Sequence, residues 1–203
     1  MVKQLAILTL CLMLGGCVST QFALVDNGRV AVNDLSLATN DLGWNKAPQI
    51  VTGYLHPNSE LWTRDGILLD RLYIISGVEN GGTLFKSASD DLVYPEFRQG
   101  MLPNEIVELL EGSFGKLLGP ETLIESSGLR PHRLGDQRAV MVDISLTASE
   151  QPTFNGRALA FVANDKLYVV TFMATEIHYF DKHWQEAEAV LNSVRLAAES
   201  EAA

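Results

Sequence analysis

Residues 1–17 constrain the rest of the chain more than any other stretch. They read MVKQLAILTLCLMLGGC, with a positive charge at Lys3, an apolar run over residues 5–14 and a cysteine behind two glycines. The run is too short to cross a hydrocarbon core, which needs about 20 residues. It has the length of the apolar region of a secretory signal, roughly 7–15 residues. We therefore expect residues 1–16 to be a signal peptide, which leaves the fold to the remainder.

The motif Leu14-Gly15-Gly16-Cys17 resembles the lipobox of bacterial lipoproteins. The resemblance implies a diacylglyceryl group on Cys17, cleavage before it, and N-acylation, with palmitate among the expected acyl chains. Several chains together give stable anchoring, whereas one binds a membrane only marginally. It also implies an envelope location facing the periplasm, and Val18, rather than Asp, favours the inner leaflet of the outer membrane. The alternatives are an ordinary secretory signal with a chance cysteine, or a buried N-terminal helix.

The remainder of the chain is acidic and holds no further cysteine. The formal net charge is −10, with 25 Asp and Glu against 15 Lys and Arg. This balance disfavours nucleic acid and anionic lipid head groups as partners. Cys11 lies within the apolar run, so the processed chain would carry Cys17 alone. An internal disulfide and a zinc–thiolate site are then excluded, and we expect neither a metal nor a cofactor.

Residues 17–48 are expected to form a lipidated N-terminus with short strands. The Asn27-Gly28 pair between apolar residues predicts a hairpin over 24–32. A further short strand is expected at 35–37, and a turn over 43–48. We expect the hairpin to lie against the main sheet, so that the body sits close to the membrane.

The main domain is expected over residues 49–198, with a frayed tail at 199–203. Asp65-Gly66 predicts the turn of a hairpin whose second strand is 67–75. The polar stretch 86–100 predicts a loop longer than most, either mobile or functional. Alternation and β-branched residues predict further strands at 122–126, 129–134, 138–146, 154–163 and 166–174, the last of them central in the sheet.

Two amphipathic helices are expected within this domain. The first begins at Pro103 with Asn104 as its cap, and it ends at Gly119-Pro120. Its apolar residues recur at intervals of three and four. The second is capped by Asp181 and presents one apolar face over 184–194.

The order of elements from residue 103 to 196 resembles the Mog1/PsbP/DcrB-like group. The residues that carry the likeness are Gly156-Arg157-Ala158, Lys166-Leu167-Tyr168-Val169-Val170 and Leu191-Asn192-Ser193-Val194. The resemblance implies an α+β fold in which an antiparallel β-sheet is flanked by helices, an α/β/α sandwich. These are packing residues, so the resemblance implies a fold and transfers no binding site.

No motif of the chain predicts catalysis. The stretch 112–116, GSFGK, lacks the spacing and the following hydroxyl of a phosphate-binding loop. His178 and His183 are five residues apart, which does not align two side chains on one helical face as three or four would. We therefore expect surface or capping roles for both histidines rather than a shared metal.

Four residues form a candidate interaction surface: Trp44, Trp62, Asp90 and Asp91. Core packing is the favoured alternative for the two tryptophans. For the two aspartates the favoured alternative is a solvated loop.

Together these features predict a membrane-anchored envelope lipoprotein that is not an enzyme. It would act as an adaptor, assembly or scaffold factor for another envelope protein. One alternative is a small-ligand or lipid-binding module with a pocket between the sheet and the helix starting at Asn104, for which an apolar cavity would be the sign. Another is a hydrolase using a loop carboxylate such as Asp90 or Glu96.

Overall fold

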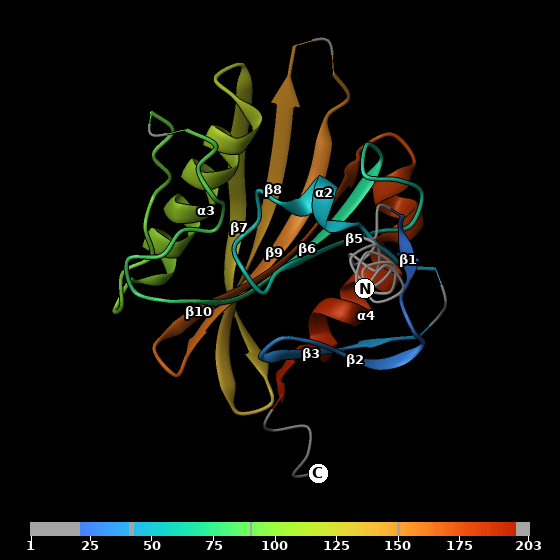
Figure 1. The fold of residues 1–203 in the computed structure, drawn as a ribbon, viewed down its shortest axis with the longest axis horizontal. Coiled ribbons are helices and arrows are strands. Elements are labelled where there is room, and N and C mark those ends of the chain that lie inside the picture. Colours follow the sequence, from blue (N-terminus) through green and yellow to red (C-terminus); the bar gives the residue numbers. More distant parts are fainter. Residues whose placement is uncertain (1–20, 41–42, 90, 150, 198–203) are drawn as a thin grey trace, which may run out of the picture.

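A large antiparallel sheet carries the fold (Figure 1). The computed structural model describes residues 21–40, 43–89, 91–149 and 151–197, and all structural statements concern these. The strands of the large sheet are β1 (Ala23–Leu24), β4 (Asn45–Lys46), β5 (Glu60–Thr63), β6 (Asp70–Val78), β7 (Thr122–Leu134), β8 (Gln137–Ala148), β9 (Phe154–Ala163) and β10 (Lys166–Thr175). They lie in the order β1-β4-β5-β6-β10-β9-β8-β7.

A smaller sheet and three helices complete the described structure. The smaller sheet has the order β11-β3-β2 and consists of β2 (Gly28–Val32), β3 (Leu35–Thr39) and β11 (Arg195–Leu196). The helices are the short α2 (Gln49–Thr52) and the longer α3 (Pro103–Leu118) and α4 (Tyr179–Ser193). No helix among the described residues is long and apolar enough to cross a membrane.

Helix α3 lies on one side of the large sheet, and α4 and the smaller sheet lie on the other (Figure 1). The large sheet separates two apolar cores, one under α3 and one under α4 and the smaller sheet. Strand β10 shows why, because its side chains alternate between the two faces. Leu167 and Val169 pack on the α3 side, whereas Tyr168 and Val170 pack on the α4 side. The strand lies between β6 and β9. The expected α/β/α sandwich and the central place of β10 are thereby confirmed.

The N-terminal hairpin over 24–32 was predicted wrongly. Strand β1 pairs with β4, and β2 pairs with β3 through a turn at Asn33, whose φ of 51° is the left-handed conformation that Asn tolerates. The chain therefore passes from one sheet to the other at Asn27-Gly28 instead of folding back. Strand β4 pairs with β5, so the segment 43–48 contains a strand where a turn was expected.

Two strand boundaries differ from those the sequence predicted. The β5–β6 hairpin is present, but 66–69 form a turn in which the Gly66 carbonyl accepts from the N–H groups of Leu69 and Asp70. Strand β7 is continuous over the two predicted pieces. A bulge between Ser127 and Arg130, with Gly128 at φ 61°, absorbs the irregularity that made the sequence look broken.

The long loop 86–100 is tied to the core rather than free. Tyr94 and Phe97 are buried among the residues under α3. At the base of the loop, the Phe97 N–H donates to the carbonyl of Gly82, and the Phe97 carbonyl accepts from the N–H of Gly81, both at 2.8 Å. The two aromatic side chains give this polar stretch its anchor.

Helix α3 begins as predicted at Pro103, but its cap is different. Leu102 is the N-cap, and its backbone N–H donates to the Glu105 carboxylate at 2.7 Å. This is one half of a capping box, and the acidic side chain also suits the positive end of the helix dipole. Asn104 lies inside the first turn and is exposed, so the assignment of Asn104 as the cap was wrong.

Glu105→Ala is expected to lower the free energy of unfolding by about 1 kcal/mol, because the cap hydrogen bond to the Leu102 N–H is lost. Asn104→Ala is the matched control and should change it by less than about 0.5 kcal/mol. Urea unfolding followed by circular dichroism measures both. Equal losses in the two variants would refute this account of the cap.

The start of α4 also differs from the prediction. His178 is the N-cap and has a φ of 79° with a ψ of −51°. The Tyr179 N–H bonds to the Ile177 carbonyl at 3.0 Å, which closes a tight turn around it. Asp181 therefore does not cap the helix; it lies in the first turn, where the dipole favours an acid. The predicted apolar face is confirmed by the burial of Ala187, Val190 and Leu191.

Candidate functional site

The predicted interaction residues do not share one surface. Trp44 and Trp62 are only 1% and 0% exposed and pack in the core on the α4 side. The two tryptophans were therefore assigned wrongly to a surface, and the core alternative is confirmed for both. Asp91 is exposed on the long loop. Asp90 and Cys17 lie outside the described residues.

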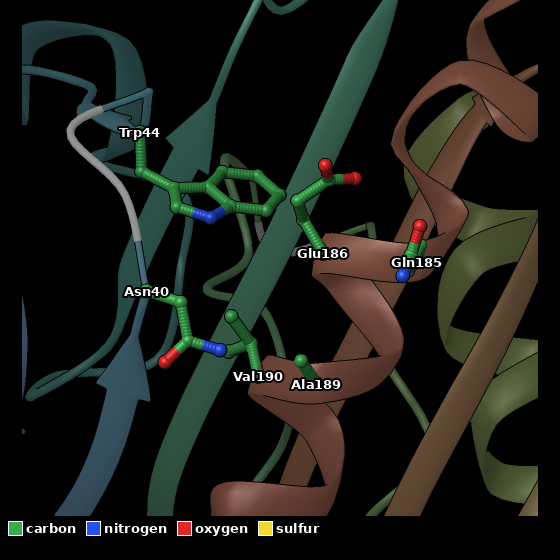
Figure 2. Close-up of a pocket in the computed structure, with 6 residues that line it drawn as sticks. All are labelled: Asn40, Trp44, Gln185, Glu186, Ala189 and Val190. Carbon is green, nitrogen blue, oxygen red and sulfur yellow. The ribbon is translucent and has the colours of Figure 1, made fainter.

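Trp44 borders a hollow of about 300 Å³ between the end of β3 and α4 (Figure 2). The side chains around it include Asn40, Gln185 and Glu186, so its lining is mixed. The Glu186 Oε2 atom has no hydrogen-bond partner among the described residues. We assign the hollow no ligand.

A buried carboxylate, Asp70, organises the turn between β5 and β6. It accepts from the backbone N–H of Arg64 at 2.6 Å and of Asp65 at 2.8 Å. It also accepts from the Thr63 hydroxyl at 3.1 Å, while that hydroxyl oxygen accepts from the Gly66 N–H. The side chain is completely buried. Asp70 thus satisfies donors that the tight turn would otherwise leave without partners.

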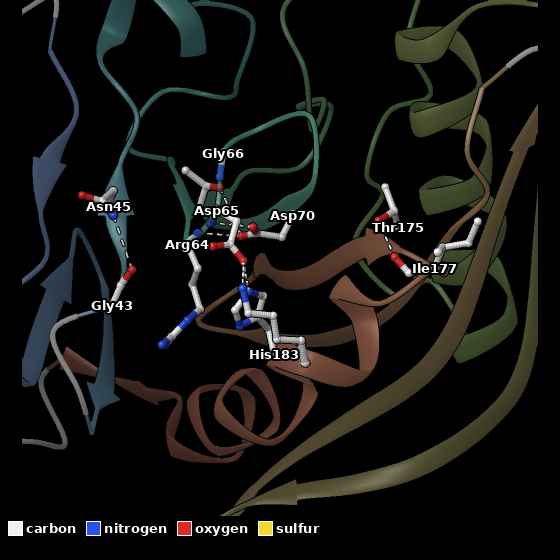
Figure 3. A network of polar contacts seen from close by, with 11 residues as sticks. Gly43, Asn45, Arg64, Asp65, Gly66, Asp70, Thr175, Ile177 and His183 are labelled. Atoms are coloured by element: carbon white, nitrogen blue, oxygen red, sulfur yellow. Dashed lines mark hydrogen bonds and ion pairs between the residues drawn. The ribbon is translucent and has the colours of Figure 1, made fainter.

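Asp65, next to it, reaches across to α4 (Figure 3). Its Oδ2 atom lies 2.6 Å from Lys182 Nζ and also contacts His183 Nε2. The hydrogen bond from Lys182 lowers the pKa of the Asp65 carboxyl below its ordinary value of 3.8; partial burial opposes this, and the contact with His183 adds to it. The contacts of Asp65 with Lys182 and His183 hold the β5–β6 hairpin against α4.

Ligating atoms of Asp65, Asp70 and His183 lie within 4.8 Å of one another, the grouping of a possible metal site. Asp70, however, already accepts three hydrogen bonds. A cation would also have to displace the Lys182 ammonium from Asp65. We therefore assign these three residues a structural role rather than a metal-binding one. Sequence reasoning missed it because Asp65 was considered only as a turn residue, and its partners lie more than a hundred residues away.

A groove lies on the α3 side of the sheet, where Pro103 at the helix start faces the paired ends of β7 and β8. Its volume is about 570 Å³ and most of its lining is apolar. We call it the α3 groove; its lining is Pro103, Leu129, Arg130, Pro131, His132, Arg133, Arg138, Ala139 and Val140. A second hollow of about 470 Å³ shares Pro103, Arg138, Ala139 and Val140 with it and extends toward β9. The two adjoin and run along the sheet.

Two arginines at the end of the α3 groove have no charged partner among the described residues. Arg133 and Arg138 stand directly opposite each other in the β7–β8 register and are exposed. Neither guanidinium forms an ion pair or a hydrogen bond with any residue that the structure describes. Like charges directly opposite each other in a sheet destabilise it. The pair would therefore be stabilised by an anion placed between them.

The neighbouring charges in the groove are already compensated. Arg130 pairs with Asp143 at 3.0 Å, and Asp143 also binds Arg157, whose guanidinium stacks over Trp184. Burial would raise the pKa of Asp143, but the hydrogen bonds from Arg130 and Arg157 outweigh it and lower that pKa. Burial, with Arg130 close by, lowers the pKa of His132 below 6.5, so this histidine is neutral at pH 7. The free positive charge of the groove thus comes from Arg133 and Arg138.

Glu96, a residue of the hydrolase alternative, is exposed beside a shallow hollow of about 390 Å³ on the long loop. The other described side chains around it include Thr83, Ser87 and Ser89, and Glu96 is the one carboxylate among them. General acid–base hydrolysis needs a second titratable group within reach. The described lining offers Tyr94, but burial raises the pKa of its phenol above the ordinary value of 10, so it is a poor proton donor or acceptor at pH 7.

Comparison with known proteins supports the fold. No protein-family model matches the sequence, and no curated protein matches it. The solution structure of cyanobacterial PsbP (CyanoP) from Synechocystis sp. PCC 6803 is similar, with a TM-score of 0.56 over 91% of this chain and 99% of that chain, at 10% identity. A crystal structure from Bacteroides thetaiotaomicron VPI-5482 has a TM-score of 0.48 and 11% identity, covering 86% of this chain and 50% of that one. The likeness to the cyanobacterial PsbP structure confirms the expected PsbP-like fold.

Proposed function

We propose that this protein is a lipid-anchored accessory protein of the bacterial envelope, without catalytic activity, that binds another envelope protein through the α3 groove. The observation that carries the proposal is the groove itself, an exposed apolar channel ending in two arginines without partners among the described residues. The Leu14-Gly15-Gly16-Cys17 motif supports anchoring through Cys17. The proposed location is the periplasmic side of the outer membrane.

The composition of the groove suits protein recognition. An exposed apolar patch next to polar residues is typical of interaction sites. Arginine is enriched at such sites because its planar guanidinium forms several hydrogen bonds while its stem packs on apolar surface. In a chain of net charge −10, a positive patch also selects for anionic partners by contrast with the rest of the surface.

A small-ligand or lipid-binding module is the second candidate. The groove lies at the start of α3, where a pocket was expected if the protein binds a small ligand or lipid. Its volume of about 570 Å³ falls within the range of ligand pockets, roughly 300–1,000 Å³. The channel is open along the sheet, however, so it would leave much of a small ligand in water. Mass spectrometry of protein extracted from membranes distinguishes the two, because a ligand module would carry a stoichiometric small molecule.

The anchor gives the first test. Radiolabelled palmitate should be incorporated into the wild-type protein, and Cys17→Ala should lose the label and leave the membrane fraction, since no other mature cysteine can be acylated. Cys11→Ala is the matched control and should be labelled as the wild type is. Continued labelling of Cys17→Ala would refute the anchor.

The partner gives the second test. Chemical crosslinking in intact cells, followed by affinity purification of the wild-type protein, should recover a second envelope protein well above background. The Cys17→Ala protein should recover much less of it, because membrane attachment raises the local concentration of the two proteins. Recovery of no protein above background would overturn the adaptor function.

A further inference from the structure

We propose that the α3 groove binds an extended segment of the partner in which an acidic residue adjoins apolar ones, with the carboxylate held between Arg133 and Arg138. This inference rests on the proposed function and adds the chemistry of the partner. It is carried by the juxtaposition of the arginine pair with the apolar floor formed by Pro131 and Val140.

The two arginines can act on one anion. Residues directly opposite in an antiparallel pair have Cβ atoms about 4.5–5.5 Å apart. Both guanidiniums can therefore reach a single carboxylate, one through two parallel N–H groups and the other through a further N–H group. Asp136, in the turn that joins the strands, forms no ion pair with either of them in the structure described. An anion from another molecule would neutralise the pair.

The apolar floor determines which residues of the partner can lie beside the carboxylate. Pro131 and Val140 lie opposite each other in the β7–β8 register, next to the arginine pair and on the same face of the sheet. Pro103 faces them from the start of α3, and the second hollow continues past Ala160 and Val162 on β9. A chain held at the arginines would therefore pass over an apolar surface. In an extended peptide lying on this face, every second side chain would point toward the arginines and the apolar floor.

An extended peptide fits better than an anionic lipid. An acyl chain is bound favourably only where most of its surface leaves the water, and the channel is open along the sheet. The core beneath it is filled by buried side chains of α3 such as Ile106 and Leu110. The acidic body would also be repelled by a membrane rich in anionic lipid.

Fluorescence anisotropy with defined peptides tests this. The full-length protein, purified from membranes into zwitterionic nanodiscs, is titrated against a labelled peptide in which a single Glu adjoins Leu residues. The matched probe has Gln in place of Glu. The acidic peptide should bind about tenfold more tightly than the Gln peptide, and added salt should reduce the difference because the attraction is electrostatic.

The protein variant tests the residues themselves. Arg133→Gln with Arg138→Gln should weaken binding of the acidic peptide about tenfold and leave binding of the Gln peptide unchanged. Arg195→Gln, an exposed arginine on β11 outside the groove, is the control and should have no effect. Removing two like charges that face each other should not destabilise the fold, and unchanged urea unfolding of the double variant verifies this.

Three results would overturn the inference. Equal binding of the Glu and Gln peptides would show that the carboxylate is not recognised. Unchanged binding of the acidic peptide by the double variant would show that the arginine pair does not hold it. Displacement of the peptide when phosphatidylglycerol is added to the nanodiscs would indicate a lipid occupant instead. If crosslinking in cells still recovers a partner while the acidic peptide fails to bind, the adaptor function stands and this inference alone fails.

Discussion

Asp70→Ala is expected to lower the free energy of unfolding by about 3–4 kcal/mol. The buried carboxylate accepts two backbone N–H groups and the Thr63 hydroxyl, at 2.6–3.1 Å. Alanine would leave these donors without partners, away from water, and charge-assisted hydrogen bonds are the costly ones to lose. The turn that places Asp65 against α4 would loosen with it.

Two variants make the Asp70 result specific. Asp70→Asn keeps one acceptor and should lose about half as much stability. Asp136→Ala removes an exposed acid from another turn and should change stability by less than about 0.5 kcal/mol. Urea unfolding measures all three. Stabilisation of the wild type by added Ca²⁺ or Zn²⁺, absent in Asp70→Ala, would contradict the structural assignment and restore the metal interpretation.

Phe85→Ala is expected to cost about 4 kcal/mol, the range for a fully buried aromatic side chain reduced to a methyl group. The Phe85 ring lies 5.2 Å from that of Phe114 on α3 and 5.7 Å from that of Tyr94 on the long loop, both at steep angles. It is also 6.4 Å from the Tyr73 ring on β6. Edge-to-face pairs of this kind add to the burial energy. Phe85 therefore joins the sheet, α3 and the loop.

The control for this prediction is Phe22→Ala, since Phe22 is 45% exposed. It should change stability by less than about 0.5 kcal/mol. Phe85→Leu should recover part of the loss, because the volume is restored in part and the ring contacts are not. A loss below about 1 kcal/mol for Phe85→Ala would mean that the aromatic cluster does not hold α3 on the sheet.

The sequence predicted the elements whose pattern repeats over many residues. The alternation in β8 and the apolar residues at helical spacing in α3 are local signals, so both were found. It failed at Asn27-Gly28, because a turn pair does not reveal which sheet the next strand joins. It failed likewise at Asn104, where the capping group belongs to Glu105 one residue further along.

The α3 groove was predictable only in part. The ligand-binding hypothesis predicted a pocket near the start of α3, but it did not predict the two arginines at the end of the groove. The signal was present, because a two-residue turn at Gly135-Asp136 places Arg133 directly opposite Arg138. The wall at Pro103 comes from a distant part of the chain, and only the folded sheet brings it there. The burial of Trp44 and Trp62 likewise results from tertiary packing.

The central claim is that the α3 groove is the binding surface, and site-specific photocrosslinking in cells tests it most directly. A photoreactive amino acid is placed at Leu129, which is 42% exposed and lines the groove, or at Leu68, which is 75% exposed in the β5–β6 turn. The prediction is one defined crosslinked protein from position 129, diminished by Arg133→Gln with Arg138→Gln, and none from position 68. The same product from position 68, or none from position 129, would contradict it.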